Sequence, residues 1–398
     1  MQLSIKLRLM LKMTPKMDLS NNLCLDLNNA ILKKLTLVVP THNRNYYLSR
    51  CLNYLTQFPF GKIIVADSST TQKKETNKKI ISHATTRSII DYLDYPSETE
   101  PCGGDIYRKW ADALEHVETK YSIFCTDKEF LVPSTLCKCI DCLETHNDCN
   151  VAEGNYYYIE SPTPGKYRRR AMYPTKCSLL QTDAVSRLNA AKTGKNISSN
   201  QMALRRSDFH KRLYQTLIDE KINDIRFGEF SLEFLSIIRS KSIYLDLPFR
   251  YRDVCNLTSS GTLQKHESSS LRYPDLHTYI SKGIYEEYYA RFLNCMSNEI
   301  AENSSYDKEK ARIYANEVLP QIIRMRGFYG NTKFTEDPLW YLWRHSPTCV
   351  KDFAGRIVPK QYLDHSSDFP DEAKPILSLI ETTKHLYATD TPICNGDL

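Results

Sequence analysis

Residues 35–44, LTLVVPTHNR, decide the fold class of this 398-residue chain. The run LTLVV is apolar and rich in β-branched residues, and Pro40 ends it, which predicts a buried strand. A polar loop, THNR, follows, and apolar residues then recur at helical spacing over residues 46–55. A second buried strand is predicted over residues 62–66. Strand, loop, helix and strand form a βαβ unit, and such units build parallel sheets.

The same alternation continues further along the chain. Strands are predicted over residues 88–93 and 121–125, and helices over residues 105–117 and 133–144. Three predicted strands end in polar or acidic clusters, at residues 41–44, 67–69 and 126–129. Because the carboxyl ends of parallel strands share the edge of the sheet where ligands bind, we expect these three clusters to meet there.

Later segments carry weaker patterns. Residues 154–170 are rich in Tyr, Arg and Lys, so they either bind phosphates or planar rings, or form a solvated turn or edge strand. A helix is predicted to start at or just after Gly228-Glu229, and a strand covers residues 242–245. Long helical patterns without strands follow, at residues 285–302 and 307–324. Three parts are predicted: a basic extension (1–34), an α/β domain (35–255) and a helical C-terminal region (256–398).

Composition and charge exclude several classes of protein. With 41% hydrophobic and 25% charged residues the chain is neither disordered nor collagen-like, and no apolar run is long enough to span a bilayer. A net charge of +6 spread over the chain is too mild for a nucleic-acid footprint. The first 20 residues lack the hydrophobic segment of a secretion signal, and they suit an ordinary basic extension or a segment lying on an anionic membrane.

The 13 cysteines are scattered along the chain. Cys137, Cys139 and Cys142 are close in sequence, but no second Cys pair or His pair accompanies them, as a zinc site would need. We interpret them as small apolar residues on a helix. Scattered free thiols indicate a reducing compartment, so the predicted location is the cytoplasm.

Three segments, 37–44, 63–69 and 124–130, resemble in order and spacing the motifs of family 2 type glycosyltransferases with the GT-A fold. The resemblance covers about residues 35–150, and more loosely extends to about 255. It implies a GT-A-like, Rossmann-type α/β fold, in which a mixed, mostly parallel sheet is flanked by helices. The implied activity is sugar transfer from a nucleotide-diphosphate donor to a saccharide or lipid-linked acceptor, as in surface polysaccharide or glycan synthesis.

The resemblance also implies roles for individual residues. Thr41 and Arg44 fall where the family's first loop contacts the base and the phosphates, and Asp67 falls where a carboxylate accepts a hydrogen bond from a uracil-like base. Asp127 and Glu129 replace the family's Asp-x-Asp, so they would contact the ribose and a divalent cation, Mn or Mg.

Basic residues of the preceding helix, Lys109 and secondarily Arg108, would help to hold the donor. Glu229 falls where the family has its general base, with Glu233 as the alternative. A carboxylate near a helix start is kept ionised by the helix dipole, and it would take the proton of an acceptor hydroxyl in an inverting transfer.

Two departures from the family pattern leave alternatives open. Lys128 stands between the two acidic residues, and Phe230 follows Glu229 where a second acidic residue is usual. Both departures also suit a non-catalytic sugar- or partner-binding protein on the same scaffold. A nucleotidyltransferase is a further alternative, although the loop THNR has no glycine to cradle phosphates. A lipid-linked acceptor would agree with peripheral contact at the cytoplasmic face of a membrane.

Overall fold

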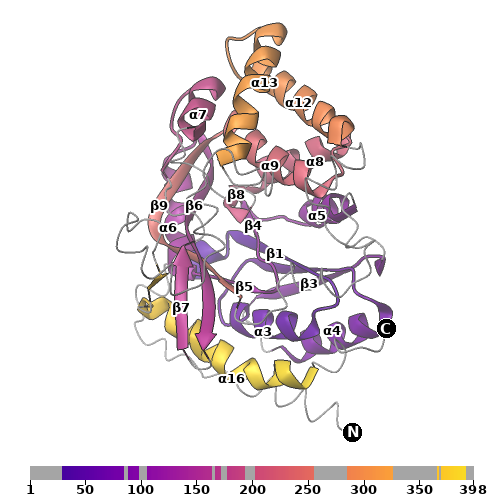
Figure 1. Ribbon diagram of the computed structural model, residues 1–398. Helices are drawn as coiled ribbons and strands as arrows, with labels where there is room; N and C mark the ends of the chain where they lie inside the picture. Colours follow the sequence, from indigo (N-terminus) through magenta and orange to yellow (C-terminus); the bar gives the residue numbers. More distant parts are fainter. Residues whose placement is uncertain are drawn as a thin grey trace.

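The computed structural model describes residues 29–84, 88–97, 105–163, 166–171, 177–192, 202–254, 285–325, 365–366 and 369–390. A mixed sheet of 10 strands lies at the centre, and helices cover both of its faces (Figure 1). The main strand order is β10-β7-β6-β8-β4-β1-β2-β3, and β9 pairs with β5 and β6. The predicted fold class, a mixed α/β sheet flanked by helices, is confirmed.

The N-terminal half of the sheet is parallel throughout. Its strands are β1 (Leu35–Thr41), β2 (Lys62–Asp67), β3 (Ile89–Asp94) and β4 (Tyr121–Phe124). Side chains of β1 alternate between two cores, since Leu37 and Val39 pack on one face and Val38 packs on the other. Strands β1, β2 and β4 are buried on both faces and read as nearly continuous apolar runs, which is why the sequence predicted them. Strand β3, at the end of the strand order, was also predicted although it is half-exposed.

The other half of the sheet combines parallel and antiparallel pairs. It contains β5 (Glu129–Leu131), β6 (Cys149–Thr163), β7 (Lys166–Ala171), β8 (Leu204–Arg206), β9 (Lys241–Asp253) and β10 (His365–Ser366). The long strand β6 pairs with β9 in parallel and with β7 and β8 antiparallel. The Tyr- and Arg-rich segment is thus strand, and Arg168 and Arg170 form ion pairs with Glu160 at 2.8 and 2.6 Å.

One face of the sheet is covered by α3 (Asn45–Leu55), α4 (Thr71–His83), α6 (Pro133–Thr145) and α16 (Lys374–Asp390), which the 3-10 turn η6 (Asp371–Ala373) precedes. Cys137 and Cys139 of α6 are buried in this core, and Cys142 is half-buried beside it. All three are free thiols, so their interpretation as small apolar residues is confirmed.

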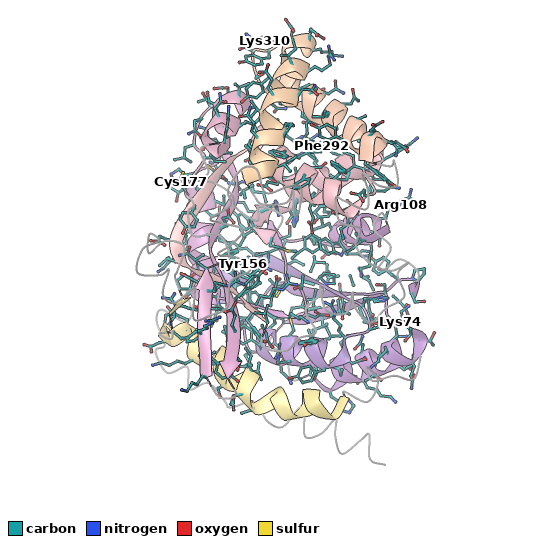
Figure 2. All side chains as sticks on the ribbon, viewed as in Figure 1. Lys74, Arg108, Tyr156, Cys177, Phe292 and Lys310 are labelled. Atoms are coloured by element: carbon teal, nitrogen blue, oxygen red, sulfur yellow. The ribbon has the colours of Figure 1, made fainter. Side chains whose placement is uncertain are left out.

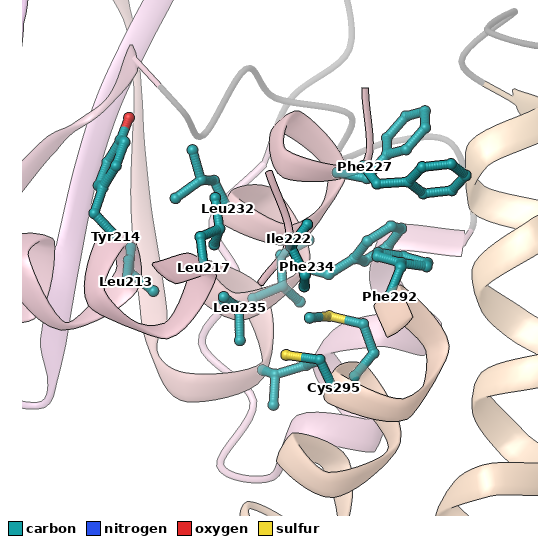
Figure 3. Packing of buried hydrophobic residues seen from close by; sticks show 14 of the residues in the cluster. Leu213, Tyr214, Leu217, Ile222, Phe227, Leu232, Phe234, Leu235, Phe292 and Cys295 are labelled. Carbon is teal, nitrogen blue, oxygen red and sulfur yellow. The ribbon is translucent and has the colours of Figure 1, made fainter. Parts of the chain in front are cut away.

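The other face is covered by α5 (Asp105–Glu115), α7 (Ala184–Ala190), α8 (Ser207–Asp219) and α9 (Ile225–Arg239). The predicted long helices are confirmed as α12 (Tyr285–Glu302) and α13 (Lys308–Met325). Figure 3 shows Phe292 and Cys295 of α12 packed close to Phe234 and Leu235 of α9, and the rings of Phe234 and Phe292 lie 5.9 Å apart. None of the helices in the described ranges is both long and apolar enough to cross a membrane.

The predicted domain boundaries stay a prediction. Helix α12 shares a core with α9, while α16 contacts α3 on the opposite face of the sheet. Residues 1–28 of the predicted basic extension lie outside the described residues.

Candidate functional site

The carboxyl ends of three parallel strands meet at one edge of the sheet. Thr41, the last residue of β1, is in register with Asp67, the last residue of β2. Val38 of β1 is in register with Phe124, the last residue of β4, so the loop that begins at Cys125 emerges at the same edge. The predicted meeting of the three polar clusters is confirmed. We call this group of loops the strand-end site.

The first two loops of the strand-end site are tied together by hydrogen bonds. The amide of Asn43 donates to Ser69 Oγ over 2.7 Å, and the amide of Thr70 donates to Asn43 Oδ1 over 2.9 Å. Asn43 has a φ of 56°, a left-handed conformation that asparagine adopts more readily than most residues. His42 Nδ1 lies 2.8 Å from the Ser68 carbonyl oxygen. The two loops therefore form a single preorganised unit.

Asp67 is fully buried, and it holds this unit to its surroundings. One carboxylate oxygen accepts from the amide of Ser69 at 2.8 Å. The other accepts from Asn77 Nδ2 at 2.8 Å and from the Tyr92 hydroxyl at 2.9 Å. These donors come from α4 and β3, so Asp67 fixes the loop after β2. Its predicted contact with a nucleotide base stays a prediction.

Lys109 of α5 is buried beside both loops. Its Nζ donates to Ser68 Oγ over 2.9 Å and to the Thr41 carbonyl oxygen over 3.5 Å. The structure therefore brings this predicted donor-binding residue to the strand-end site. Arg108, the secondary candidate next to it, is exposed at the surface of α5 (Figure 2).

Asp127 joins the first loop to the loop after β4. Its carboxylate accepts from Thr41 Oγ1 over 3.0 Å and lies 3.4 Å from Arg44 Nη1. The Asp127 side chain is buried, whereas a quarter of the Arg44 side chain (25%) is exposed. Thr41 and Arg44, which the resemblance assigned to the same ligand as Asp127, thus both contact Asp127 directly.

Lys128 is also buried, and this is unusual for a lysine. Its Nζ lies 4.4 Å from the centroid of the Tyr47 ring, and within the described part of the chain it makes no ion pair within 4.0 Å. Burial lowers the pKa of Lys128 most, and the charges of Arg44 and Arg252 lower it further. Asp127 acts in the opposite direction, and the resulting pKa is about 7. The lysine therefore points inward, next to other cations.

Glu129 begins β5 and is fully buried in a network of donors. Its carboxylate pairs with Arg250 and accepts from the Tyr156 hydroxyl and from the Thr126 amide. Arg252 Nη1 lies 3.9 Å from the same carboxylate. Burial acts to raise the pKa of Glu129, but the charges of the two arginines and these hydrogen bonds hold it below its ordinary value.

This arrangement bears on the predicted divalent cation. Mn²⁺ and Mg²⁺ need carboxylate oxygens with lone pairs directed at the ion. The oxygens of Glu129 are directed at Arg250, Tyr156 and Thr126 instead, and those of Asp127 are directed at Thr41 and Arg44. In the described ranges, no group of three or more His, Cys, Asp or Glu side chains is placed to hold a metal ion. The residues present do not fit the predicted pair of metal ligands.

The helix that carries Glu229 begins earlier than predicted. Helix α9 starts at Ile225, because Asp224 caps it: Asp224 Oδ1 accepts from the amide of Phe227 over 2.9 Å. Glu229 therefore lies in the second turn and not at the start, so the dipole argument for its ionisation is wrong in detail. A periodicity search does not detect a cap that precedes the first apolar residue.

Glu229 and Glu233 differ in how accessible they are. Glu229 is half-buried, whereas Glu233 is 3% exposed. The start of α9 is bound to α5, since the Tyr107 hydroxyl donates to the Ile225 carbonyl oxygen over 2.6 Å. The Tyr107 ring would lie 2.2 Å from a Cβ at Gly228, so only glycine allows this approach. A base must reach its acceptor, and this favours Glu229 over Glu233.

Strands β9 and β6 bring further residues to the site whose roles the sequence pattern did not reveal. Arg250 is fully buried, and its Nη2 donates to the carbonyl oxygens of Phe124 and Met202 over 2.6 and 2.8 Å. Arg252 lies opposite Glu129 across the β5–β9 pair, and Tyr156 of β6 lies inside the molecule beside them (Figure 2). The sequence did contain a pattern that pointed to them: Arg250 and Arg252 are separated by one residue, which places both on the same side of a strand.

No protein-family model and no curated protein matches the chain. Among solved structures, that of S. aureus TarS is similar to it, with 16% identity and a TM-score of 0.45 over 88% of this chain and 55% of TarS. The 1–349 fragment of TarS in complex with UDP-GlcNAc has 16% identity and a TM-score of 0.46 over 89% of this chain and 92% of the fragment. The same fragment in complex with UDP has 15% identity and a TM-score of 0.44. The chain thus spans about half of the first TarS chain, and at these TM-scores the likeness decides nothing about activity.

Proposed function

We propose that the chain is a glycosyltransferase that moves a sugar from a nucleotide-diphosphate donor to a saccharide or lipid-linked acceptor. The observation that carries this proposal is the direct contact of Asp127 with both Thr41 and Arg44 at the carboxyl ends of parallel strands. In open α/β sheets this edge is where ligands bind, and arginine side chains there recognise phosphate oxygens.

Each residue of the strand-end site has a proposed role toward the donor. Thr41 and Arg44 contact the nucleotide and its phosphates, and Asp127 accepts from a ribose hydroxyl. Asp67 and Lys109 act by holding the two loops that receive the nucleotide, because their polar atoms are already bonded to those loops or their supports. Glu129 is assigned to the support of the site, since its carboxylate is paired with Arg250.

The proposed transfer step inverts the anomeric carbon. The acceptor oxygen forms a bond to this carbon while the bond from the carbon to the diphosphate oxygen breaks. The bonding electron pair leaves with the diphosphate, and the acceptor proton passes to the Glu229 carboxylate. Positioned general bases of this kind contribute about 10²- to 10⁴-fold to rate.

A donor screen tests the proposal. The full chain is mixed with a panel of nucleotide sugars, beginning with UDP-GlcNAc because one of the TarS structures holds it. Thermal stability and donor hydrolysis are measured with and without Mn²⁺ or Mg²⁺. A true donor at about 100 times its Kd should add about 2.7 kcal/mol of stability. If no nucleotide sugar in the panel stabilises the chain or is hydrolysed, the proposal is wrong.

The base is tested separately once a donor is known. Glu229→Gln should keep the donor affinity and lose transfer by about 10²-fold or more. Glu233→Gln is the matched control on the same helix, and it should keep most transfer activity. Donor binding without hydrolysis or transfer in the wild-type chain would instead favour the non-catalytic sugar-binding alternative.

A further inference from the structure

Two arginines near the strand-end site have their charge balanced inside the protein. Arg50 forms a buried ion pair with Asp253 at 2.6 Å, and its guanidinium packs within 5.5 Å of the centroids of three aromatic rings. Arg250 forms a second buried pair with Glu129. Each of these pairs is neutral as a unit, so neither provides net charge for a ligand.

Three further cations lie at the strand-end site, and the additional carboxylate beside them is that of Asp127. Arg44 contacts Asp127 at 3.4 Å, and Lys128 follows Asp127 in the chain. Arg252 reaches the strand-end site from β9, and its side chain is 23% exposed. Strand β9 is fixed to the loop after β4 because the amide of Asp253 donates to the Lys128 carbonyl oxygen over 3.0 Å. Within the described residues, positive charge therefore exceeds negative charge at this edge.

This excess of positive charge destabilises the folded protein when no ligand is bound. A buried ammonium loses hydration, and the attraction of Asp127 does not compensate Lys128 for that loss. Repulsion from Arg44 and Arg252 adds to the cost for Lys128. Such arrangements of ionisable groups concentrate at functional sites, and a bound anion would supply the missing negative charge here.

We propose that Arg44, Lys128 and Arg252 bind the diphosphate of the donor and stabilise it as it leaves, in place of a divalent cation. The inference rests on the proposed function, and it follows from the poor fit of Asp127 and Glu129 to a metal. When the sugar departs, the electron pair of the broken bond adds negative charge to the diphosphate. Preorganised cations aimed at that developing charge lower the barrier as a metal ion otherwise would.

Binding of nucleoside diphosphates tests this inference. The full chain is titrated with UDP and with GDP by calorimetry, once with excess EDTA and once with Mn²⁺. We expect binding in EDTA, with a Kd within about threefold of the value in Mn²⁺. Since charge-assisted hydrogen bonds to phosphate are strong, Lys128→Met and Arg252→Gln should each weaken binding by about tenfold or more.

Matched controls separate a role in binding from a role in folding. Lys79→Met and Arg212→Gln remove equal charges from exposed helix positions and should leave the Kd unchanged. Lys128→Met should in addition raise the melting temperature of the ligand-free protein, which the loss of a merely structural lysine would lower. Circular dichroism shows whether Arg252→Gln is folded, and Arg252→Lys, which keeps the charge, should restore part of the affinity.

The outcomes distinguish this inference from the proposed function. Binding or turnover that requires Mn²⁺ would overturn the replacement of a metal and leave the glycosyltransferase proposal intact. Metal-free binding that the variants at positions 128 and 252 do not weaken would also overturn it. If neither diphosphate binds under either condition and no nucleotide sugar is hydrolysed, the proposed function fails and the inference fails with it.

Discussion

Asp127 and Glu129 are two residues apart, yet they belong to regions of opposite character. Glu129 is fully buried and engaged by Arg250, Tyr156 and a backbone amide, so its region is a closed support. The region of Asp127 has a partly exposed Arg44 and a buried Lys128 that makes no ion pair within 4.0 Å with any of the described residues. One half of the acidic motif is thus part of the buried support, while the other half is the one that we propose contacts a ligand.

The largest effect on stability is expected from removing the arginine that pairs with Glu129 in the closed region. Arg250→Met leaves the Glu129 carboxylate buried without its main cation, and the carbonyl oxygens of Phe124 and Met202 lose their donor. Breaking a buried pair in this way costs about 3–5 kcal/mol. Urea denaturation should show this loss in the free energy of unfolding.

The double variant Glu129→Met, Arg250→Met is the control, because it removes both charges together. It should lose less stability than the sum of the two single variants. A loss below about 1 kcal/mol for Arg250→Met alone would mean that the Glu129 region is not the support described here.

In the region of Asp127, a substitution is expected to raise the free energy of unfolding instead of lowering it. Lys128→Met replaces a buried ammonium by an apolar side chain of similar length, and the methionine can pack against Tyr47. The free energy of unfolding without ligand should therefore rise by about 1–2 kcal/mol. Lys79→Met, at an exposed position, should change it by less than about 0.5 kcal/mol.

A smaller effect concerns pH. Burial holds the native pKa of Lys128 at about 7, below the ordinary value of 10.5. Between these values the unfolded chain binds more protons than the native chain, so wild-type stability gains from this residue as pH rises. The stability advantage of Lys128→Met over the wild type should thus be largest below about pH 7 and should narrow towards about pH 9. An advantage that stays constant or widens over this range would contradict the assignment.

The smallest change in stability is expected for Asp127→Asn. The amide oxygen still accepts from Thr41, so the free energy of unfolding should fall by about 1 kcal/mol or less. Affinity for the nucleotide should nevertheless fall by about tenfold, because a charged acceptor is lost. Glu129→Gln is the comparison variant, and it should lose more stability than Asp127→Asn. Equal losses would remove the distinction between the two regions.

Much of the fold was predictable from local pattern. The strands β1, β2 and β4 are buried runs bounded by polar residues, β3 is a half-exposed strand at the end of the sheet, and α12 was predicted with its observed bounds. The placement of Thr41, Asp67 and Asp127 at one edge followed from the rule that parallel strands end together. The start of α9 was placed about three residues late, because the capping Asp224 lies outside the apolar pattern.

The sequence by itself determined which segments are strands and helices and which of their ends are polar, since periodicity and turn chemistry act over a few residues. Only the tertiary structure decided what each polar residue does. Glu129 pairs with an arginine 121 positions away, and no pattern in the neighbouring sequence predicts that partner. A carboxylate becomes a ligand-binding group or a buried support according to the charges that distant strands place beside it, and those positions exist only once the sheet has formed.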